Sequence, residues 1–257
     1  MVEWLVLAVY FVLLLFIFLY SLTQLSLILK YRNRRPISTP EMNQDWPMVT
    51  IQLPIFNEKY VAERLIHSIV KLDYPKDKLE IQVLDDSTDD TIVLTRKTAE
   101  IYKRQGFDIS VIHRVDRSGY KAGALAEGLA TAKGEFIAIF DADFIPKSSF
   151  LKESIPHFQS EKVGVVQTRW EHLNRNYSQL TKLQAFGLDA HFTVEQGGRN
   201  EGGYFINFNG TAGVWRKQCI EDAGGWSSDT LTEDLDLSYL AQLKEWQFIF
   251  REDIGSP

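Results

Sequence analysis

The chain has little cysteine and no surplus of basic residues, and both shortages exclude classes of protein. Cys219 is the only cysteine among 257 residues, so no internal disulfide can form, and no cysteine–histidine cluster has the spacing of a structural zinc site. The formal net charge is −6, whereas nucleic-acid binding depends on an excess of lysine and arginine facing phosphates. The sequence therefore predicts neither a disulfide scaffold nor a nucleic-acid-binding protein.

Glycine-rich phosphate loops are also absent from the sequence. It contains neither G-x-x-x-x-G-K-S/T nor G-x-G-x-x-G, which argues against P-loop and dinucleotide-binding functions. It contains no internal repeat and no low-complexity segment, and its apolar and charged fractions are those of an ordinary folded chain.

The N-terminus carries a long uncharged segment. No charged residue occurs from Trp4 to Leu29, and a helix that rises about 1.5 Å per residue over that length can cross a hydrocarbon core of about 30 Å. A cleaved signal peptide is the alternative, but such peptides have a basic start and a shorter apolar core, whereas this start carries Glu3. We predict a transmembrane anchor over residues 1–30.

A basic flank follows the predicted anchor. Its charged residues are Lys30, Arg32, Arg34 and Arg35 of KYRNRR. The positive-inside rule places such a flank on the cytoplasmic side of a plasma membrane or inner membrane, with the N-terminus outside and the rest of the chain in the cytosol. Residues 31–47 then predict a linker, because they are rich in proline and polar side chains.

The remainder of the chain, residues 48–257, alternates between strand and helix patterns. The predicted strands are VTIQLPIF (49–56), EIQVLDDS (80–87), ISVIHR (109–114), EFIAIFDADF (135–144) and VGVVQTRW (163–170). Predicted helices between them include VAERLIHSIVKL (61–72) and YKAGALAEGLATA (120–132). This order predicts an α/β domain with a mostly parallel sheet covered by helices, whose ligands bind beyond the carboxyl ends of the strands.

Polar residues follow three of the predicted strands. They are Asn57 and Glu58 after the first, Asp85 and Asp86 at the end of the second, and Asp141 and Asp143 at the end of the fourth. Each alone is explained by a turn or a helix cap, and within DDSTDDT we expect Ser87 or Thr88 to cap the next helix. Together they converge on one edge of the sheet, which predicts a functional site there.

Carboxylates at this edge suit a divalent metal. Mg²⁺ and Mn²⁺ prefer oxygen ligands, and magnesium is commonly held by one or two carboxylates together with substrate phosphates. We therefore predict that Asp141 and Asp143 bind Mg²⁺ or Mn²⁺ with a nucleotide diphosphate, where the ion neutralises charge on the departing diphosphate.

The segment LTEDLDLS has a structural and a catalytic interpretation. Thr230 and Glu233 match a capping box, and acidic residues in a first helical turn are stabilised by the helix dipole. Catalysis is compatible with that position, because an ionised aspartate at a helix start can accept a proton.

Six motifs, in this order and spacing, resemble those of family 2 glycosyltransferases. They are VTIQLPIFNE, VLDDSTDDT, GYKAGAL, FDADF, FNGTAGVWR and LTEDLDLSYLAQLKEW, within roughly residues 48–255. The resemblance is to the membrane-bound branch of cellulose-synthase-like and glucomannan-synthase-like proteins, which have the GT-A fold. It implies an inverting transfer of a hexose from a UDP-glucose or GDP-mannose type of donor to a glycan or lipid-linked acceptor at the cytosolic membrane face, in β-glycan synthesis.

The resemblance also implies roles for single residues on the donor side. Asp141 and Asp143 are the D-x-D pair that engages metal and diphosphate. Lys121 lies near the diphosphate, with an exposed helix lysine as the alternative. The residues expected at the nucleoside are Glu58 and one or both of Asp85 and Asp86.

On the acceptor side the resemblance makes Asp234 of the T-E-D motif the general base. Glu233 and Thr232 orient the site or the acceptor. In FNGTAGVWR, residues Asn209, Gly210 and Trp215 are expected near the acceptor, and a glycine-rich turn before a strand is the alternative.

One feature of the family is missing from the sequence. The membrane synthases carry Q-x-x-R-W after T-E-D and then further membrane helices, whereas this sequence ends at Pro257, and QTRW at 167–170 has the wrong spacing and order. We therefore expect a truncated sequence: either the natural protein continues or this is a shortened version. A non-catalytic nucleotide-sugar-binding or scaffold module is the alternative function. A nucleotidyltransferase on a similar fold is a third hypothesis, but it explains neither T-E-D nor the membrane span.

Overall fold

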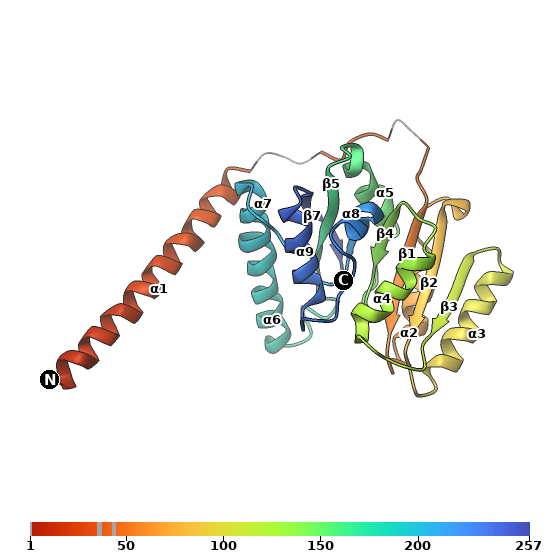
Figure 1. Ribbon diagram of the computed structural model, residues 1–257, viewed down its shortest axis with the longest axis horizontal. Coiled ribbons are helices and arrows are strands. Elements are labelled where there is room, and N and C mark those ends of the chain that lie inside the picture. The colour runs from red at the N-terminus through yellow and green to blue at the C-terminus, as the bar shows by residue number, and fades with distance from the viewer. Residues whose placement is uncertain (1, 35–37, 43–44) are drawn as a thin grey trace.

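The computed structural model describes residues 2–34, 38–42 and 45–257 and contains a seven-stranded sheet with helices on both faces (Figure 1). The spatial order is β3-β2-β1-β4-β6-β5-β7, and β6 runs antiparallel to its neighbours β4 and β5. The strands are β1 (Val49–Ile55), β2 (Leu79–Asp85), β3 (Asp108–His113), β4 (Phe136–Ile139), β5 (Val163–Trp170), β6 (Gly213–Arg216) and β7 (Gln247–Ser256). The predicted α/β class and mostly parallel sheet are confirmed.

Helices cover the two faces of the sheet and enclose two cores. One core lies under α2 (Ala62–Ile69), α3 (Thr91–Arg104) and α5 (Phe150–Ser154), and the other under α4 (Tyr120–Thr131), α8 (Lys217–Asp222) and α9 (Glu233–Leu243). In β4, Phe136 and Ala138 belong to the first core and Ile137 and Ile139 to the second. The alternation arises because successive strand residues point to opposite faces. Short segments η1 (Lys76–Lys78) and η2 (Ile155–Gln159) precede β2 and β5.

The fourth strand is shorter than the sequence predicts. It ends at Ile139, so FDADF lies beyond the strand rather than within it. The backbone N–H of Asp141 donates to Thr211 Oγ1 at 2.8 Å and not to a neighbouring strand. Leaving the ladder here frees both aspartates to project from the carboxyl edge of the sheet. Strands β6 and β7 were not in the predicted set, because GVWR is short and REDI interrupts the apolar pattern of β7 with charges.

Helix α1 (Val2–Arg32) is a single long helix that projects away from the domain (Figure 1). It is long and apolar enough to cross a membrane, which a signal sequence can also be. Its C-terminal turns pack on η3 (His191–Gly197), a π-helix, and on α7 (Gly198–Gly202), which continue from α6 (Gln179–Ala190). A Cβ on Gly198 would lie 2.8 Å from the Leu27 carbonyl oxygen, so glycine is what allows this close approach.

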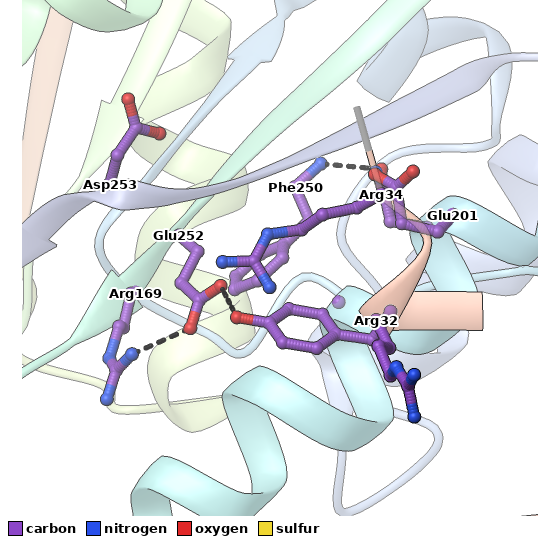
Figure 2. Close-up of a pocket in the computed structure, with 10 residues that line it drawn as sticks. Arg32, Arg34, Arg169, Glu201, Phe250, Glu252 and Asp253 are labelled. Atoms are coloured by element: carbon purple, nitrogen blue, oxygen red, sulfur yellow. Dashed lines mark hydrogen bonds and ion pairs between the residues drawn. The ribbon is translucent and has the colours of Figure 1, made fainter. Parts of the chain in front are cut away.

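The end of α1 borders a hollow of about 660 Å³, and Glu252 of β7 lies beside it (Figure 2). The Glu252 carboxylate accepts hydrogen bonds from the Tyr31 hydroxyl at 2.5 Å, Arg169 Nη1 at 2.8 Å and Thr193 Oγ1 at 2.7 Å. One carboxylate thus joins α1 to β5, β7 and η3. Arg35 of the predicted basic flank lies outside the described residues, as do 36–37 and 43–44 of the predicted linker.

Candidate active site

A cavity of about 400 Å³ lies beyond the carboxyl ends of β1, β2 and β4. Of the predicted residues, those that line it are Glu58, Asp86, Lys121, Asp141 and Asp143. The structure therefore brings together polar groups from all three strand ends named by the sequence, at the edge where open α/β sheets bind ligands.

Lys121 lines this cavity and contacts two separate segments of the chain. Its Nζ lies 2.5 Å from Asp141 Oδ1 and 3.0 Å from the Gly210 carbonyl oxygen. Burial raises the pKa of Asp141, and the Lys121 ammonium opposes that rise. Lys121 is therefore not an ordinary exposed helix lysine, because both of its contacts lie at the site.

Asp143 presents a carboxylate to the cavity without an ion pair to a described residue. Its backbone carbonyl accepts from Arg64 Nη2 at 3.3 Å, which ties the loop to α2. Nearby, burial raises the pKa of Glu58, and the charges of Asp141 and Asp143 add to that rise. This edge of the cavity is therefore rich in carboxylates and suited to a cation.

The donor set can be tested for fit to a divalent metal. Within the described ranges, no group of three or more His, Cys, Asp or Glu side chains is placed to hold an ion by itself. Two carboxylates are present, Asp141 and Asp143, and magnesium-type sites commonly use one or two carboxylates completed by substrate phosphates. The residues fit a metal that is bound jointly with a diphosphate.

The T-E-D motif begins α9, as the acidic first turn predicts. Glu233, Asp234 and Asp236 lie in the first turn, but the N-cap is Thr232 and its side chain makes no cap hydrogen bond. The predicted capping box from Thr230 is therefore wrong, because the helix starts two residues later than that box requires. Burial raises the pKa of Glu233, and Lys121 acts against this rise.

Gly210 lies between the D-x-D and T-E-D segments. It has φ +78°, and a Cβ there would lie 3.1 Å from Asp234 Oδ2 and 3.5 Å from Lys121 Nζ. Glycine both tolerates this backbone conformation and leaves room for the two charged groups. The D-x-D edge, through Asp141 and Lys121, and the T-E-D helix, through Asp234, therefore meet at one point.

The two predicted nucleoside aspartates have different surroundings. Asp85 is fully buried, where Oδ1 accepts from Ser87 N–H at 2.8 Å and Oδ2 from Thr95 Oγ1 at 2.5 Å. Asp86 lines the cavity and forms a two-pronged pair with Arg114, with Nε at 2.8 Å from Oδ1. Of this pair only Asp86 lines the cavity, with its carboxylate buried against Arg114.

The helix after this loop is not capped as the sequence predicts. The N-cap of α3 is Asp90, and neither Ser87 nor Thr88 caps the helix. Ser87 Oγ instead accepts from the backbone N–H of Asn57 at 2.9 Å, and Thr88 N–H donates to Asn57 Oδ1 at 2.8 Å. These hydroxyl-bearing residues join the ends of β1 and β2 beside the cavity.

The three residues predicted near the acceptor are placed differently. Trp215 is fully buried in β6 against Phe208 and Trp226, so the prediction that it contacts an acceptor is wrong: the ring belongs to the core. Asn209 has a buried Nδ2 without a hydrogen-bond partner in the described part of the chain. Gly210 lies beside Asp234. The alternative interpretation, a glycine-rich turn before a strand, also holds, because β6 starts at Gly213.

Arg114, Arg117 and Thr211 also shape the site and were missed by sequence reasoning. Arg117 lines the cavity with its guanidinium 3.5 Å from the centre of the Phe56 ring, and Thr211 holds the backbone of Asp141. One signal for the arginines is present in the sequence: HRVDRSGYKAG concentrates basic residues just before Lys121. Lone arginines are usually exposed, so the pattern does not separate these from surface residues.

The chain is similar in sequence to proteins of a known family. The model of the family described as "Glycosyltransferase like family 2" matches residues 47–253. The chain is 43% identical over 219 residues to glucomannan 4-beta-mannosyltransferase 1 of Cyamopsis tetragonoloba, covering 83% of this chain and 42% of that protein. It is 45% identical over 214 residues to probable glucomannan 4-beta-mannosyltransferase 4 of Oryza sativa subsp. japonica, covering 81% and 39%. The chain thus spans about two fifths of the length of these relatives.

Solved structures share the fold. The mannosyltransferase PcManGT from Pyrobaculum calidifontis, in complex with GDP-Man and Mn²⁺, superposes with a TM-score of 0.70 at 24% identity over 90% of this chain and 64% of that one. S. aureus TarS 1-349 with UDP-GlcNAc gives 0.60 at 18% identity over 81% and 57%. The predicted GT-A type of fold is confirmed, and the chain belongs to the glycosyltransferase like family 2.

Proposed function

We propose that the chain carries the catalytic core of a membrane-anchored hexosyltransferase that uses a nucleotide sugar in β-glycan synthesis. The observation that carries the proposal is the convergence of Asp141, Lys121 and Asp234 around Gly210, with Asp141 and Lys121 also lining the cavity. A donor of the GDP-mannose type is favoured over UDP-glucose, because the two relatives are named as mannosyltransferases. The acceptor would be a glycan or a lipid-linked sugar.

In the proposed reaction, the residues of the site have separate roles. Asp141 and Asp143 would hold Mg²⁺ or Mn²⁺, which supplies charge neutralisation for the leaving diphosphate. Lys121 would donate hydrogen bonds to the same diphosphate, since its ammonium already lies at this edge. Glu58 and Asp86 would contact the nucleoside.

Transfer would then be a single displacement at the anomeric carbon. Asp234 would accept the proton of the acceptor hydroxyl, whose oxygen forms the new bond to the sugar carbon as the bond to the diphosphate oxygen breaks with its electron pair. Attack opposite the leaving group inverts the anomeric configuration. Glu233 and Thr232, on either side of the helix start, would orient the acceptor.

Donor binding and transfer test this function together. We expect calorimetry on the purified chain to give metal-dependent binding of GDP-mannose that EDTA weakens at least about tenfold, with UDP-glucose and UDP-GlcNAc as comparison donors. Transfer is followed with a short β-mannan acceptor. Binding without transfer would favour the non-catalytic binding module, and no binding of any donor would contradict the proposal.

We further propose that α1 anchors the domain on the cytosolic face, with the N-terminus outside. Support comes from the uncharged length of α1 and from Lys30, Arg32 and Arg34 at its C-terminal end. Protease added to sealed inside-out vesicles is expected to digest the domain from β1 onward, while right-side-out vesicles protect it. Protection in the inside-out vesicles would reverse the orientation.

A further inference from the structure

A short segment before β6 is held along α9, the helix that begins at the T-E-D motif. The segment is loop 206–210, with the sequence INFNG. Gln242 Oε1 accepts from the backbone N–H of Ile206 at 3.0 Å, and Gln242 Nε2 donates to the carbonyl oxygen of the same residue at 2.9 Å. One turn earlier on the helix, Ser238 Oγ accepts from the backbone N–H of Phe208 at 2.9 Å. Both side chains are buried, so buried hydrogen bonds hold the loop on α9.

The contacts between loop and helix are evenly spaced on both partners. Every second loop residue, from 206 to 210, meets every fourth residue of α9, and these helix residues are Gln242, Ser238 and Asp234. Four residues of an α-helix rise about 6.0 Å, and two residues of an extended chain rise about 6.6 Å. The loop therefore stays in register with α9 over two helical turns, and Gly210 meets Asp234 at the end of them.

The loop residues between these contacts are held from the other side. Gln196 of η3 donates to the carbonyl oxygen of Asn207 at 3.0 Å and accepts from its backbone N–H at 3.3 Å. Gln167 Oε1 of β5 accepts from the backbone N–H of Asn209 at 2.9 Å. Backbone groups that face alternate sides are typical of an extended strand. Buried side chains thus fix the backbone of this loop as neighbouring strands fix a strand in a sheet.

Ser238 also joins the loop to the residue proposed as the base. Its hydroxyl donates to the backbone carbonyl oxygen of Asp234 at 2.6 Å while it accepts from Phe208. The single hydroxyl hydrogen is thereby used, which fixes the orientation of the side chain. Two residues after Phe208, the carbonyl oxygen of Gly210 accepts from Lys121 Nζ at 3.0 Å. A shift of the loop along α9 would therefore displace Gly210 from both charged groups.

We propose that Ser238 and Gln242 are positioning residues for sugar transfer, and this inference rests on the reaction proposed above. They hold loop 206–210 in register with α9, which keeps Gly210 beside Asp234. A general base must lie within hydrogen-bond reach of the proton that it takes, and a displacement of about 1 Å can lower a rate about 100-fold. Loss of the register is therefore expected to lower kcat and to leave donor binding nearly unchanged.

Ser238→Ala and Gln242→Met test the proposal on the full chain, because each removes hydrogen bonds to the loop. We expect kcat for transfer from GDP-mannose to a short β-mannan to fall about 10- to 100-fold in each variant. The Kd of GDP-mannose in Mn²⁺ should stay within about threefold of the parent. Hydrogen exchange at the loop amides should become faster, since the N–H groups of Ile206 and Phe208 lose their acceptors. Ser154→Ala is the matched control, because Ser154 is a fully buried serine of α5 whose hydroxyl has no partner among the described residues.

A double variant separates positioning from a general loss of stability. If Ser238 acts through Asp234, adding Ser238→Ala to Asp234→Asn should lower the residual transfer by less than about threefold, whereas independent effects multiply. Thermal melting gives the stability of each variant, and the rates are compared at a temperature where all of them are folded.

Several results would overturn the proposal. Unchanged exchange at loop 206–210 in both variants would show that Ser238 and Gln242 do not hold it. Faster exchange with the parent kcat, or an equal loss of kcat with and without Asp234→Asn, would show that the register does not set the catalytic geometry. An equal weakening of donor binding would make both residues part of the donor site. A parent chain that transfers no sugar would overturn both proposals, whereas a parent and variants that transfer equally would contradict this inference alone.

Discussion

Asp234→Asn is expected to lower sugar transfer by about 10²–10⁴-fold while leaving donor binding nearly unchanged. A positioned base contributes on this scale, and an amide of the same shape cannot take the acceptor proton. The structure supports this role because Asp234 Oδ2 faces Gly210 at the point where Lys121 and Asp141 meet.

A matched variant separates catalysis from helix stability. Asp236→Asn removes a charge from the same first turn of α9, so it reports on the dipole alone. A purely structural role for Asp234, which lies in the first turn and not at the N-cap, predicts a stability loss of about 0.3–1 kcal/mol with normal turnover of the folded protein. Transfer should be measured in this chain and in a version extended through a Q-x-x-R-W segment. Transfer by Asp234→Asn at the parent rate in the extended version would show that Asp234 is not the base.

Much of the site could be predicted because sheet geometry is encoded locally. Apolar segments ending in Asn57-Glu58, Asp85-Asp86 and Asp141-x-Asp143 define parallel strands whose carboxyl ends share one edge. The order of these segments in the sequence was therefore enough to predict that the carboxylates lie close together. Their separate surroundings could not be predicted, because Asp85 and Asp86 are adjacent in sequence yet only Asp86 lines the cavity.

Contacts between segments far apart in the chain could not be predicted from local sequence patterns. The close approach of Gly210 to Asp234 depends on how a loop before β6 meets the start of α9. Trp215 was expected at a sugar because it follows a glycine-rich turn, but its strand lies between β4 and β5 and buries the ring. The sequence likewise gives no sign that Gly198 contacts Leu27, because this contact exists only where α1 packs on α7.

The second large effect is expected at the D-x-D pair. Asp143→Asn should weaken nucleotide binding in Mn²⁺ at least about tenfold, because an amide is a poorer ligand for a hard cation than a carboxylate of the same shape. Asp141→Asn should weaken it as well, but it also leaves Lys121 without its carboxylate partner. The fold should survive both changes, since the backbone of Asp141 is held by Thr211 and the Asp143 side chain is exposed.

The metal contribution can be isolated by repeating the calorimetry in EDTA. If the pair acts through the ion, each variant in Mn²⁺ should bind nucleotide as the parent does in EDTA, and chelation should change the variants little further. Asp77→Asn is the control, because Asp77 is exposed just before β2, at the opposite end of that strand from the cavity. A variant that loses affinity equally with and without metal would point to lost contacts with the nucleotide itself. Parent-like affinity in Mn²⁺ for both variants would leave Asp141 and Asp143 as polar residues that end a strand, with no role in binding a metal.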